Sequence, residues 1–258
     1  MSTKNLLKNL VSSKLITSKI YLGHSNKVVN LKILYFVLGI RHNIIIFNVN
    51  KLLKNLIIIY CVIVEIVAKR GFFLLFGSNQ NIPLSLIMNQ FLKKYSVEYM
   101  HKKENVGFYI TGYFSKNWIG GTFTNWKKAS DFLTKQQLLF TNENRNFNSY
   151  ANLNLVSAGF CSLIPDFLFC FDSDKLLVKE AFSLDISIIG IIDSNDDFKN
   201  FFFKIIGNND SLESIFFFCS FLEDAIQAGE AKYFYFIFKY IFKKFKSKLF
   251  LKLVNKHK

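Results

Sequence analysis

Short apolar runs alternate with longer helical patterns along this chain, and this alternation restricts the fold more than any other feature of the sequence. Runs rich in Ile and Phe, most of them nearly continuously apolar, predict strands that are buried on both faces of a sheet. We expect these strands at residues 44–47, 72–76, 107–110, 167–171 and 186–192. We expect helices at residues 51–68, 83–95, 124–139, 175–183 and 210–227. This order predicts an α/β domain with a mostly parallel sheet and right-handed crossovers.

The last segment, residues 231–258, predicts a further helix that is basic, aromatic and amphipathic. Aromatic and apolar residues recur there at helical spacing, at Phe234, Phe238, Phe242, Phe245 and Leu249. Lys239, Lys243 and Lys246 keep the same rhythm. Such a helix could lie on RNA, on a partner protein or on a membrane surface.

Basic residues dominate the charge of the chain and are segregated along it. There are 33 Lys and Arg against 18 Asp and Glu, which gives a net charge of +15. No acidic residue occurs from Met1 to Val64 or after Glu230. This excess favours nucleic acid or an anionic membrane as the partner over a small acidic metabolite. A polyanion would meet the two ends of the chain and a middle segment around Lys116, Lys127 and Lys128.

The sequence lacks the usual signatures of metal, membrane or catalytic sites. The four cysteines have no CxxC spacing and no nearby His that completes a zinc site. No apolar stretch makes a convincing membrane span, and no secretory signal is present. Asp172 and Asp193 follow two strands and could hold Mg²⁺ for phosphoryl transfer, but no P-loop accompanies them, and strand-end Asp residues also cap helices. We therefore expect no enzyme, no metal and no cofactor.

The segment WIGGTFTNW, residues 118–126, supports two interpretations. Gly120 and Gly121 allow unusual backbone conformations. Thr124 or Asn125 could cap a helix that carries Lys127 and Lys128, so that backbone N–H groups and lysines together bind a phosphate. Alternatively, Trp118 and Trp126 lock the helix onto the sheet. Both interpretations stay open at this point.

Seven blocks of residues resemble, in the same order along the chain, the motifs of the family of the second protein of the small ribosomal subunit, the universal S-two family. They are Gly23-His24 with Asn30 and Lys32, GIRHNIIIFNV at 39–49, Phe76-Gly77, NWIGGTFTNW at 117–126, PDFLF at 165–169 with Asp172, KEA at 179–181 with IIGIIDSN at 188–195, and GNND at 207–210 with Ser214-Ile215. The fourth and sixth blocks, correctly spaced, are the most specific. The resemblance also assigns residues 6–21 to the family's first helix.

The chain departs from the family pattern at several positions. Val29, Leu31, Asn79 and Asn209 replace the family's Trp, Pro, Lys and Asp. The interval 127–164 is too short and too rich in Asn for the two long coiled-coil helices that the family carries there. This predicts a shortened arm.

The resemblance implies a flavodoxin-like parallel sheet flanked by helices, in a non-catalytic component of the small ribosomal subunit that binds rRNA and neighbouring ribosomal proteins. We expect four parts: the first part of the sheet domain at 1–126, the shortened helical or loop arm at 127–164, the second part of the sheet domain at 165–230, and the basic C-terminal helix at 231–258.

The resemblance and the charge distribution together suggest which residues act. We expect rRNA contacts from Lys14, His24, Lys27, Lys32, Arg41, Lys116, Thr124, Asn125, Lys127, Lys128, Lys243 and Lys244. We expect structural roles for Trp118, Gly120, Gly121, Trp126, Asp172 and Asp193.

Composition suggests the compartment. Ile, Phe, Asn and Lys are over-used, as AT-rich codons specify, which favours an organelle-encoded protein of the mitochondrial ribosome; a plastid or a bacterial cytoplasm would leave the same trace. The alternative function is that of a peripheral membrane-binding α/β protein anchored by its tail, which is rich in Lys and Phe.

Overall fold

The computed structural model describes residues 13–77, 109–114, 118, 120–128, 155–156, 164–197 and 199–254. The helix predicted at 83–95, most of the arm at 127–164 and Lys116 lie outside these residues. Of the helix predicted at 124–139, only a first turn at 126–128 is described.

The main sheet is built from β4 (Phe72–Phe76), β5 (Tyr109–Phe114), β6 (Leu155–Val156), β7 (Phe167–Cys170), β8 (Ser187–Ile192) and β9 (Phe203–Ile206). Their spatial order is β6-β5-β4-β7-β8-β9. Every neighbouring pair from β5 to β9 is parallel, and only β6 pairs antiparallel to β5. Counted in chain order, the parallel strands lie as 2-1-3-4-5, which is the flavodoxin-like order. The predicted fold class is therefore confirmed.

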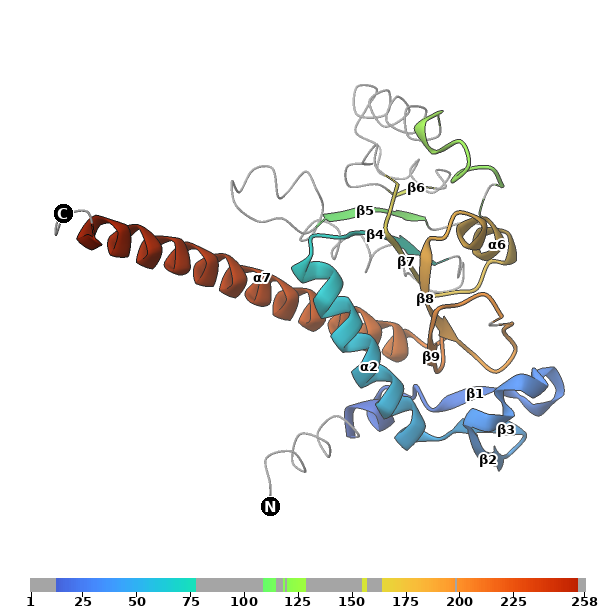
Figure 1. Ribbon diagram of the computed structural model, residues 1–258. Coiled ribbons are helices and arrows are strands. Elements are labelled where there is room, and N and C mark those ends of the chain that lie inside the picture. Colours follow the sequence, from blue (N-terminus) through green and yellow to red (C-terminus); the bar gives the residue numbers. More distant parts are fainter. Residues whose placement is uncertain are drawn as a thin grey trace, which may run out of the picture.

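Helices cover both faces of this sheet (Figure 1). The helices α2 (Val49–Ala68) and α7 (Leu212–Val254) pack on one face against alternate strand residues such as Phe73 and Phe169. The helix α6 (Lys175–Ser183) packs on the other face, against Leu168 and Ile188. Because both faces are covered, the strand residues can be apolar without alternation, as the sequence predicted.

Local side chains set where two of these helices begin. The Asn48 side chain accepts hydrogen bonds from the backbone N–H groups of Asn50 and Lys51 at the start of α2. Asp174 does the same for Leu176 and Leu177 at the start of α6. Each cap satisfies N–H groups that have no partner within the helix. The helices observed, 49–68 and 175–183, match those predicted at 51–68 and 175–183.

A small antiparallel sheet precedes the main one. It consists of β1 (Leu22–Ser25), β2 (Val37–Arg41) and β3 (Ile44–Phe47) in the order β1-β3-β2, with the 3-10 helices η1 (Asn26–Val28) and η2 (Leu31–Phe36) between β1 and β2. The strand predicted at 44–47 thus belongs to this sheet and not to the parallel one. His42 and Asn43 both adopt positive φ, at 50° and 61°, which allows the tight turn between β2 and β3.

The C-terminal part of the chain differs from the prediction. The helices expected at 210–227 and 231–258 form one continuous helix, α7, of 43 residues. It runs beside α2 and then extends beyond the rest of the molecule (Figure 1). Within the described residues, no helix combines the length and the apolar character needed to cross a membrane.

Five strands were not predicted as they occur: β1 and β2 of the small sheet were missed, and three strands of the main sheet also differ. β9 (Phe203–Ile206) was missed, β5 begins at Tyr109 rather than at 107 and ends at Phe114, and β6 lies within the interval predicted as the arm. β9 contains Lys204, the last residue of the run FFFK at 201–204, so its pattern resembles neither a buried strand nor an alternating one.

Candidate functional site

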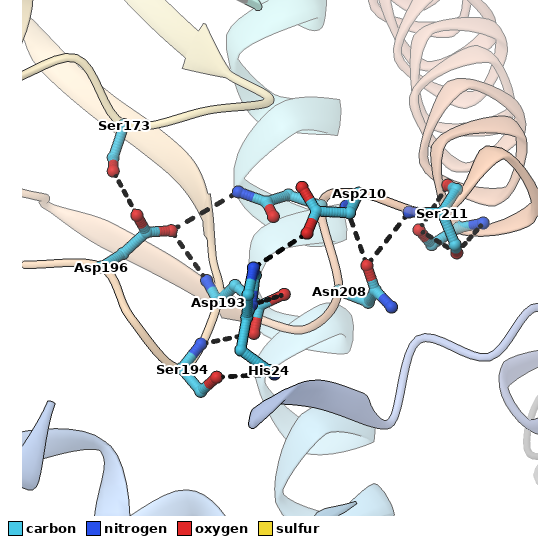
Figure 2. Close-up of polar contacts among 10 residues, drawn as sticks. His24, Ser173, Asp193, Ser194, Asp196, Asn208, Asp210 and Ser211 are labelled. Carbon is cyan, nitrogen blue, oxygen red and sulfur yellow. Dashed lines mark hydrogen bonds and ion pairs between the residues drawn. The ribbon is translucent and has the colours of Figure 1, made fainter. Parts of the chain in front are cut away.

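Polar residues gather where β8 and β9 end and where β1 crosses the same edge of the main sheet. The carboxyl ends of parallel strands lie together, so the loop after Ile192 and the loop after Ile206 are neighbours. His24 on β1 reaches both loops (Figure 2).

The imidazole of His24 lies between two carboxylates. Its Nδ1 is 3.2 Å from Oδ2 of Asp193, and its Nε2 is 2.9 Å from Oδ2 of Asp210. The Asp193 side chain is buried and that of Asp210 is exposed. Hydrogen bonds to Asp193 and then to Asp210 raise the pKa of His24 to about 10, against the opposing effect of burial. The ring is therefore protonated at neutral pH and forms two ion pairs.

A third carboxylate, that of Asp196, connects three loops. It accepts hydrogen bonds from the Ser173 hydroxyl (2.6 Å) and from the Asp193 backbone N–H (2.9 Å), and Asn209 Nδ2 lies at 3.5 Å (Figure 2). Burial raises the pKa of Asp196, and its hydrogen bonds oppose this effect. These contacts connect the loops after β7, β8 and β9.

The N-terminal segment is attached to the same loops through its backbone. The His24 N–H donates to Ser194 Oγ at 2.8 Å, and the Asn30 N–H donates to the Ser194 carbonyl at 2.8 Å. The Asn30 side chain donates to the Asp196 carbonyl at 2.9 Å. Three segments distant in sequence, 23–30, 193–196 and 208–211, therefore form one polar network.

His24, Asp193 and Asp210 could also hold a metal ion. Each offers one ligand atom, and these atoms lie within 4.8 Å of one another. From the sequence we expected no metal, because Asp193 was paired only with Asp172 and His24 was taken by itself. The available signal was the Gly-His pair at 23–24 and an Asp directly after the apolar strand at 186–192.

The two aspartates considered for Mg²⁺ have local partners. Asp193 faces His24 and also accepts a hydrogen bond from the Ser194 N–H. Asp172 accepts a hydrogen bond from the Ser173 N–H at 2.7 Å. Both contacts order the loops that follow β7 and β8.

The WIGGTFTNW turn is held by the buried Glu180 of α6. One carboxylate oxygen of Glu180 accepts from Trp118 Nε1 at 2.8 Å and from the Gly121 N–H at 3.2 Å, and the other accepts from the Thr124 N–H at 2.9 Å. The positive φ of Gly121, 89°, is a conformation that few other residues adopt. The N–H groups of Gly121 and Thr124 are therefore already paired with a carboxylate.

Buried aromatic rings complete this turn. The Trp118 and Phe123 ring centroids are 4.6 Å apart, those of Phe123 and Trp126 are 5.5 Å apart, and Trp118 also packs on Phe76 at the end of β4. In sheets with this strand order, ligands usually bind beside that strand end, at the switch point between β4 and β7. Here aromatic side chains pack at that position. The packing interpretation of the motif thus matches the observed contacts.

The predicted rRNA-binding residues are dispersed over the surface. Lys14, Lys27, Lys32, Arg41, Thr124, Asn125, Lys127 and Lys128 are exposed. Lys32 lies 3.7 Å from Asp197, whereas His24 belongs to the polar network. Lys243 and Lys244 lie on the distal part of α7, and Lys116 lies outside the described residues.

Comparison with known proteins gives a consistent result. The family model described as ribosomal protein S2 matches residues 15–229. A small ribosomal subunit protein uS2 from Ehrlichia chaffeensis is 28% identical over 82% of this chain and 74% of its own length. The uS2 protein from Brucella ovis is 27% identical over 85% of this chain and 86% of its own length. That from Koribacter versatilis is 24% identical, over 86% of this chain and 74% of its own length.

Proposed function

The chain belongs to the ribosomal protein S2 family, and from this we infer that it is a structural, non-enzymatic constituent of the small ribosomal subunit that binds rRNA and neighbouring ribosomal proteins. The observation that carries this function is the family match over residues 15–229, which takes in the whole polar network and the Glu180-bound turn. In this function the sheet positions surface residues, and its strand-end carboxylates hold loops in place.

Within this function, the exposed basic residues are the proposed rRNA contacts. Lys14, Lys27 and Arg41 lie in the acid-free first part of the chain, where no carboxylate competes within the same segment. Lys127 and Lys128 follow the Glu180-bound turn, with Thr124 and Asn125 exposed beside them. Lysines at such positions bind phosphate and orient the protein, and each contributes a salt-sensitive part of the affinity. His24, Lys32, Lys116, Lys243 and Lys244 complete the proposed set.

We also propose the division into two parts of the sheet domain, 1–126 and 165–230, a shortened arm at 127–164 and a distinct C-terminal segment at 231–258. The family match ends at residue 229, which supports treating the last segment separately. Its nine lysines and its lack of acidic residues suit a polyanionic neighbour.

The proposed location is the mitochondrial ribosome. The 31 phenylalanines and two prolines fit the drift expected of an AT-rich organellar genome. The relatives compared are bacterial, so a plastid or a bacterial cytoplasm is the alternative. Immunodetection across purified organelles decides among them, and a signal confined to mitochondria is the expected result.

Sedimentation of a mild detergent lysate through a sucrose gradient tests the function. The chain should migrate with the small subunit and leave it only after high salt or rRNA digestion. Contacts are then mapped by UV cross-linking, with peptides around residues 14–27 and 124–128 expected to carry nucleotides. A chain that stays at the top of the gradient, or floats with lipid, would favour the membrane-binding alternative and contradict this proposal.

A further inference from the structure

The segment that leads into the β2–β3 hairpin exposes an unusual amount of apolar side chain. We call these residues the hairpin patch: Leu31, Leu34, Tyr35, Leu38, Ile40 and Ile44. They lie within fourteen consecutive residues of η2, β2 and β3. Tyr35 is 70% exposed and Leu38 68%. Apolar side chains that are gathered on a surface in this way mark a contact with another molecule.

The hairpin also offers a strand edge. β2 is the outer strand of the sheet β1-β3-β2, and within the described residues it pairs with β3 alone. The surroundings of β2 are open: a Cβ added at Gly39 would meet no heavy atom within 4 Å. Figure 1 shows the hairpin apart from α7, on the outside of the molecule. An extended segment from another chain could therefore pair with this edge.

The charges around the patch are mostly basic. Lys27 before it and Arg41 within β2 are exposed, and the sequence contains no acidic residue before Glu65. Lys32 pairs with Asp197, and Lys51 Nζ lies 3.5 Å from the centroid of the Tyr35 ring, so Lys27, Arg41 and Lys51 are the cations beside the patch. Charge complementarity favours a partner with acidic residues on either side of its apolar part.

From these features we infer that the hairpin patch docks a neighbouring protein of the small subunit, which adds an extended apolar segment with acidic flanks to the edge of β2. The inference rests on the proposed function, because that function supplies the neighbour. A protein fits better than rRNA here, since phosphates and sugars bind proteins through hydrogen bonds and charge and cannot bury Leu38 and Ile40.

Site-specific photo-cross-linking tests the inference in assembled subunits. A benzophenone amino acid replaces Leu38 or Ile40 in the full-length chain, and Phe182 on α6, which is 60% exposed, serves as the control position. Small subunits are isolated by sedimentation, irradiated and digested for mass spectrometry. We expect the same protein adduct from positions 38 and 40, joined to an acidic, apolar peptide, and a different adduct or none from position 182. An adduct to rRNA, or no protein adduct from either hairpin position, overturns the inference.

A charge substitution adds a second measurement. The double variant Leu38→Glu, Ile40→Glu should still sediment with the small subunit. Because it places charges at the centre of the contact, the isolated subunits should contain about tenfold less of the cross-linked neighbouring protein. Phe182→Glu should leave the neighbour at its normal amount. Unchanged thermal unfolding of the isolated double variant establishes that it folds. A normal amount of the neighbour in this variant overturns the inference.

The experiment separates the inference from the function on which it rests. Failure of every version of the chain to sediment with the small subunit contradicts the proposed function. Normal sedimentation without a protein adduct contradicts the inference alone. A dimer of the isolated chain that disappears in Leu38→Glu would assign the patch to a second copy and would also overturn the inference.

Discussion

His24 is the residue on which most of the polar network depends. Its ring bridges Asp193 and Asp210, and its backbone N–H donates to Ser194. Asp193 is 1% exposed, so without a cationic partner its charge would be buried at a large cost in free energy. The raised pKa of His24 therefore reports that the folded state binds a proton that the unfolded chain releases at neutral pH.

This difference predicts a pH-dependent stability. The pKa of His24 is 6.5 when the chain is unfolded and about 10 when it is folded, so its stabilising effect is complete below pH 6.5 and is lost as the pH rises to 10. Part of the ring is exposed to solvent, which reduces the effect to roughly 1–3 kcal/mol. Urea unfolding of the wild type and of His24→Gln between pH 6 and 10, with EDTA to keep metal out, should show the two free energies of unfolding converging as the pH rises. A constant difference between them across this range would contradict the ion-pair assignment.

Glu180 gives a second prediction at this scale. Glu180→Gln keeps one acceptor oxygen but loses the charge and one of the two acceptors that bind Trp118, Gly121 and Thr124. We expect the free energy of unfolding to fall by about 2–3 kcal/mol, because buried donors lose their partner. Tryptophan fluorescence measures this locally, since Trp118 and Trp126 are the two tryptophans of the chain.

Glu213→Gln is the matched control, because Glu213 forms an exposed ion pair with Lys19 and we expect no resolvable change there. Equal effects of the two substitutions would show that Glu180 does not hold the turn.

The sequence showed that polar and aromatic residues matter in the His24 network and in the WIGGTFTNW turn. It did not show which of these residues contact one another. Asp193 and Trp118 were predicted to have structural roles, and these roles stay predictions. The His24–Asp193–Asp210 cluster was missed because its members lie on three segments whose proximity depends on β1 crossing the carboxyl edge of the sheet. Glu180 was noted only as part of the KEA motif at 179–181. No local pattern indicates that its carboxylate binds the N–H groups of the WIGGTFTNW turn, for which a phosphate had been considered.

At the scale of elements, the contact between α2 and α7 depends on Gly229. A Cβ at this position would lie 2.5 Å from Val67 Cβ and 3.0 Å from the Val64 carbonyl oxygen, which is closer than atoms normally approach. Within a helix Ala is otherwise more favourable than Gly. The absence of a side chain therefore allows the two helices to pack closely.

Gly229→Ala should consequently destabilise the protein, by about 1–3 kcal/mol. Val67→Gly in the same chain removes the Cβ and Cγ1 atoms that the added Cβ would meet, so the double variant should lose less stability than the two single variants added together, as chemical denaturation of all four proteins would reveal. Gly39→Ala is the control, because its Cβ meets nothing within 4 Å. If the losses of stability of the two single variants simply add in the double variant, the contact with Val67 is not the reason why position 229 requires glycine.

Elements with simple patterns were predicted well, and others were not. The strands at 72–76, 167–171 and 186–192 and the helices at 51–68 and 175–183 are apolar or periodic throughout, and the structure confirms them within about two residues. The small sheet was only partly predicted, because β2 is largely exposed on both faces and lacks a binary pattern. The break expected near Gly229 does not occur, because tight packing on α2 compensates for the low helix propensity of glycine.

At the scale of the whole molecule, burial and charge divide α7 into two parts. Up to residue 230, α7 contributes buried residues such as Phe218 and Ile226 to the core shared with α2. From 231 to 239 none of its side chains is buried, and its contacts are surface contacts such as Lys232 with Glu65 of α2 and Tyr233 with Arg70, which follows α2. The segment 231–258 carries nine of the 33 basic residues and no acidic ones, so without it the net charge falls from +15 to +6.

Deletion of 231–258 should therefore weaken RNA binding while the fold persists. Because only surface contacts are lost, we expect a small decrease in Tm. Each lost phosphate contact should reduce the slope of the logarithm of the RNA-binding constant against the logarithm of the salt concentration by about 0.9 in magnitude or less. Binding of transcribed small-subunit rRNA between about 50 and 300 mM KCl measures this slope. A full-length variant with all nine tail lysines changed to Gln separates charge from the aromatic side chains. Equal slopes for the wild type, the deletion and this variant would mean that the tail contacts no phosphate, and that its aromatic residues bind a protein instead.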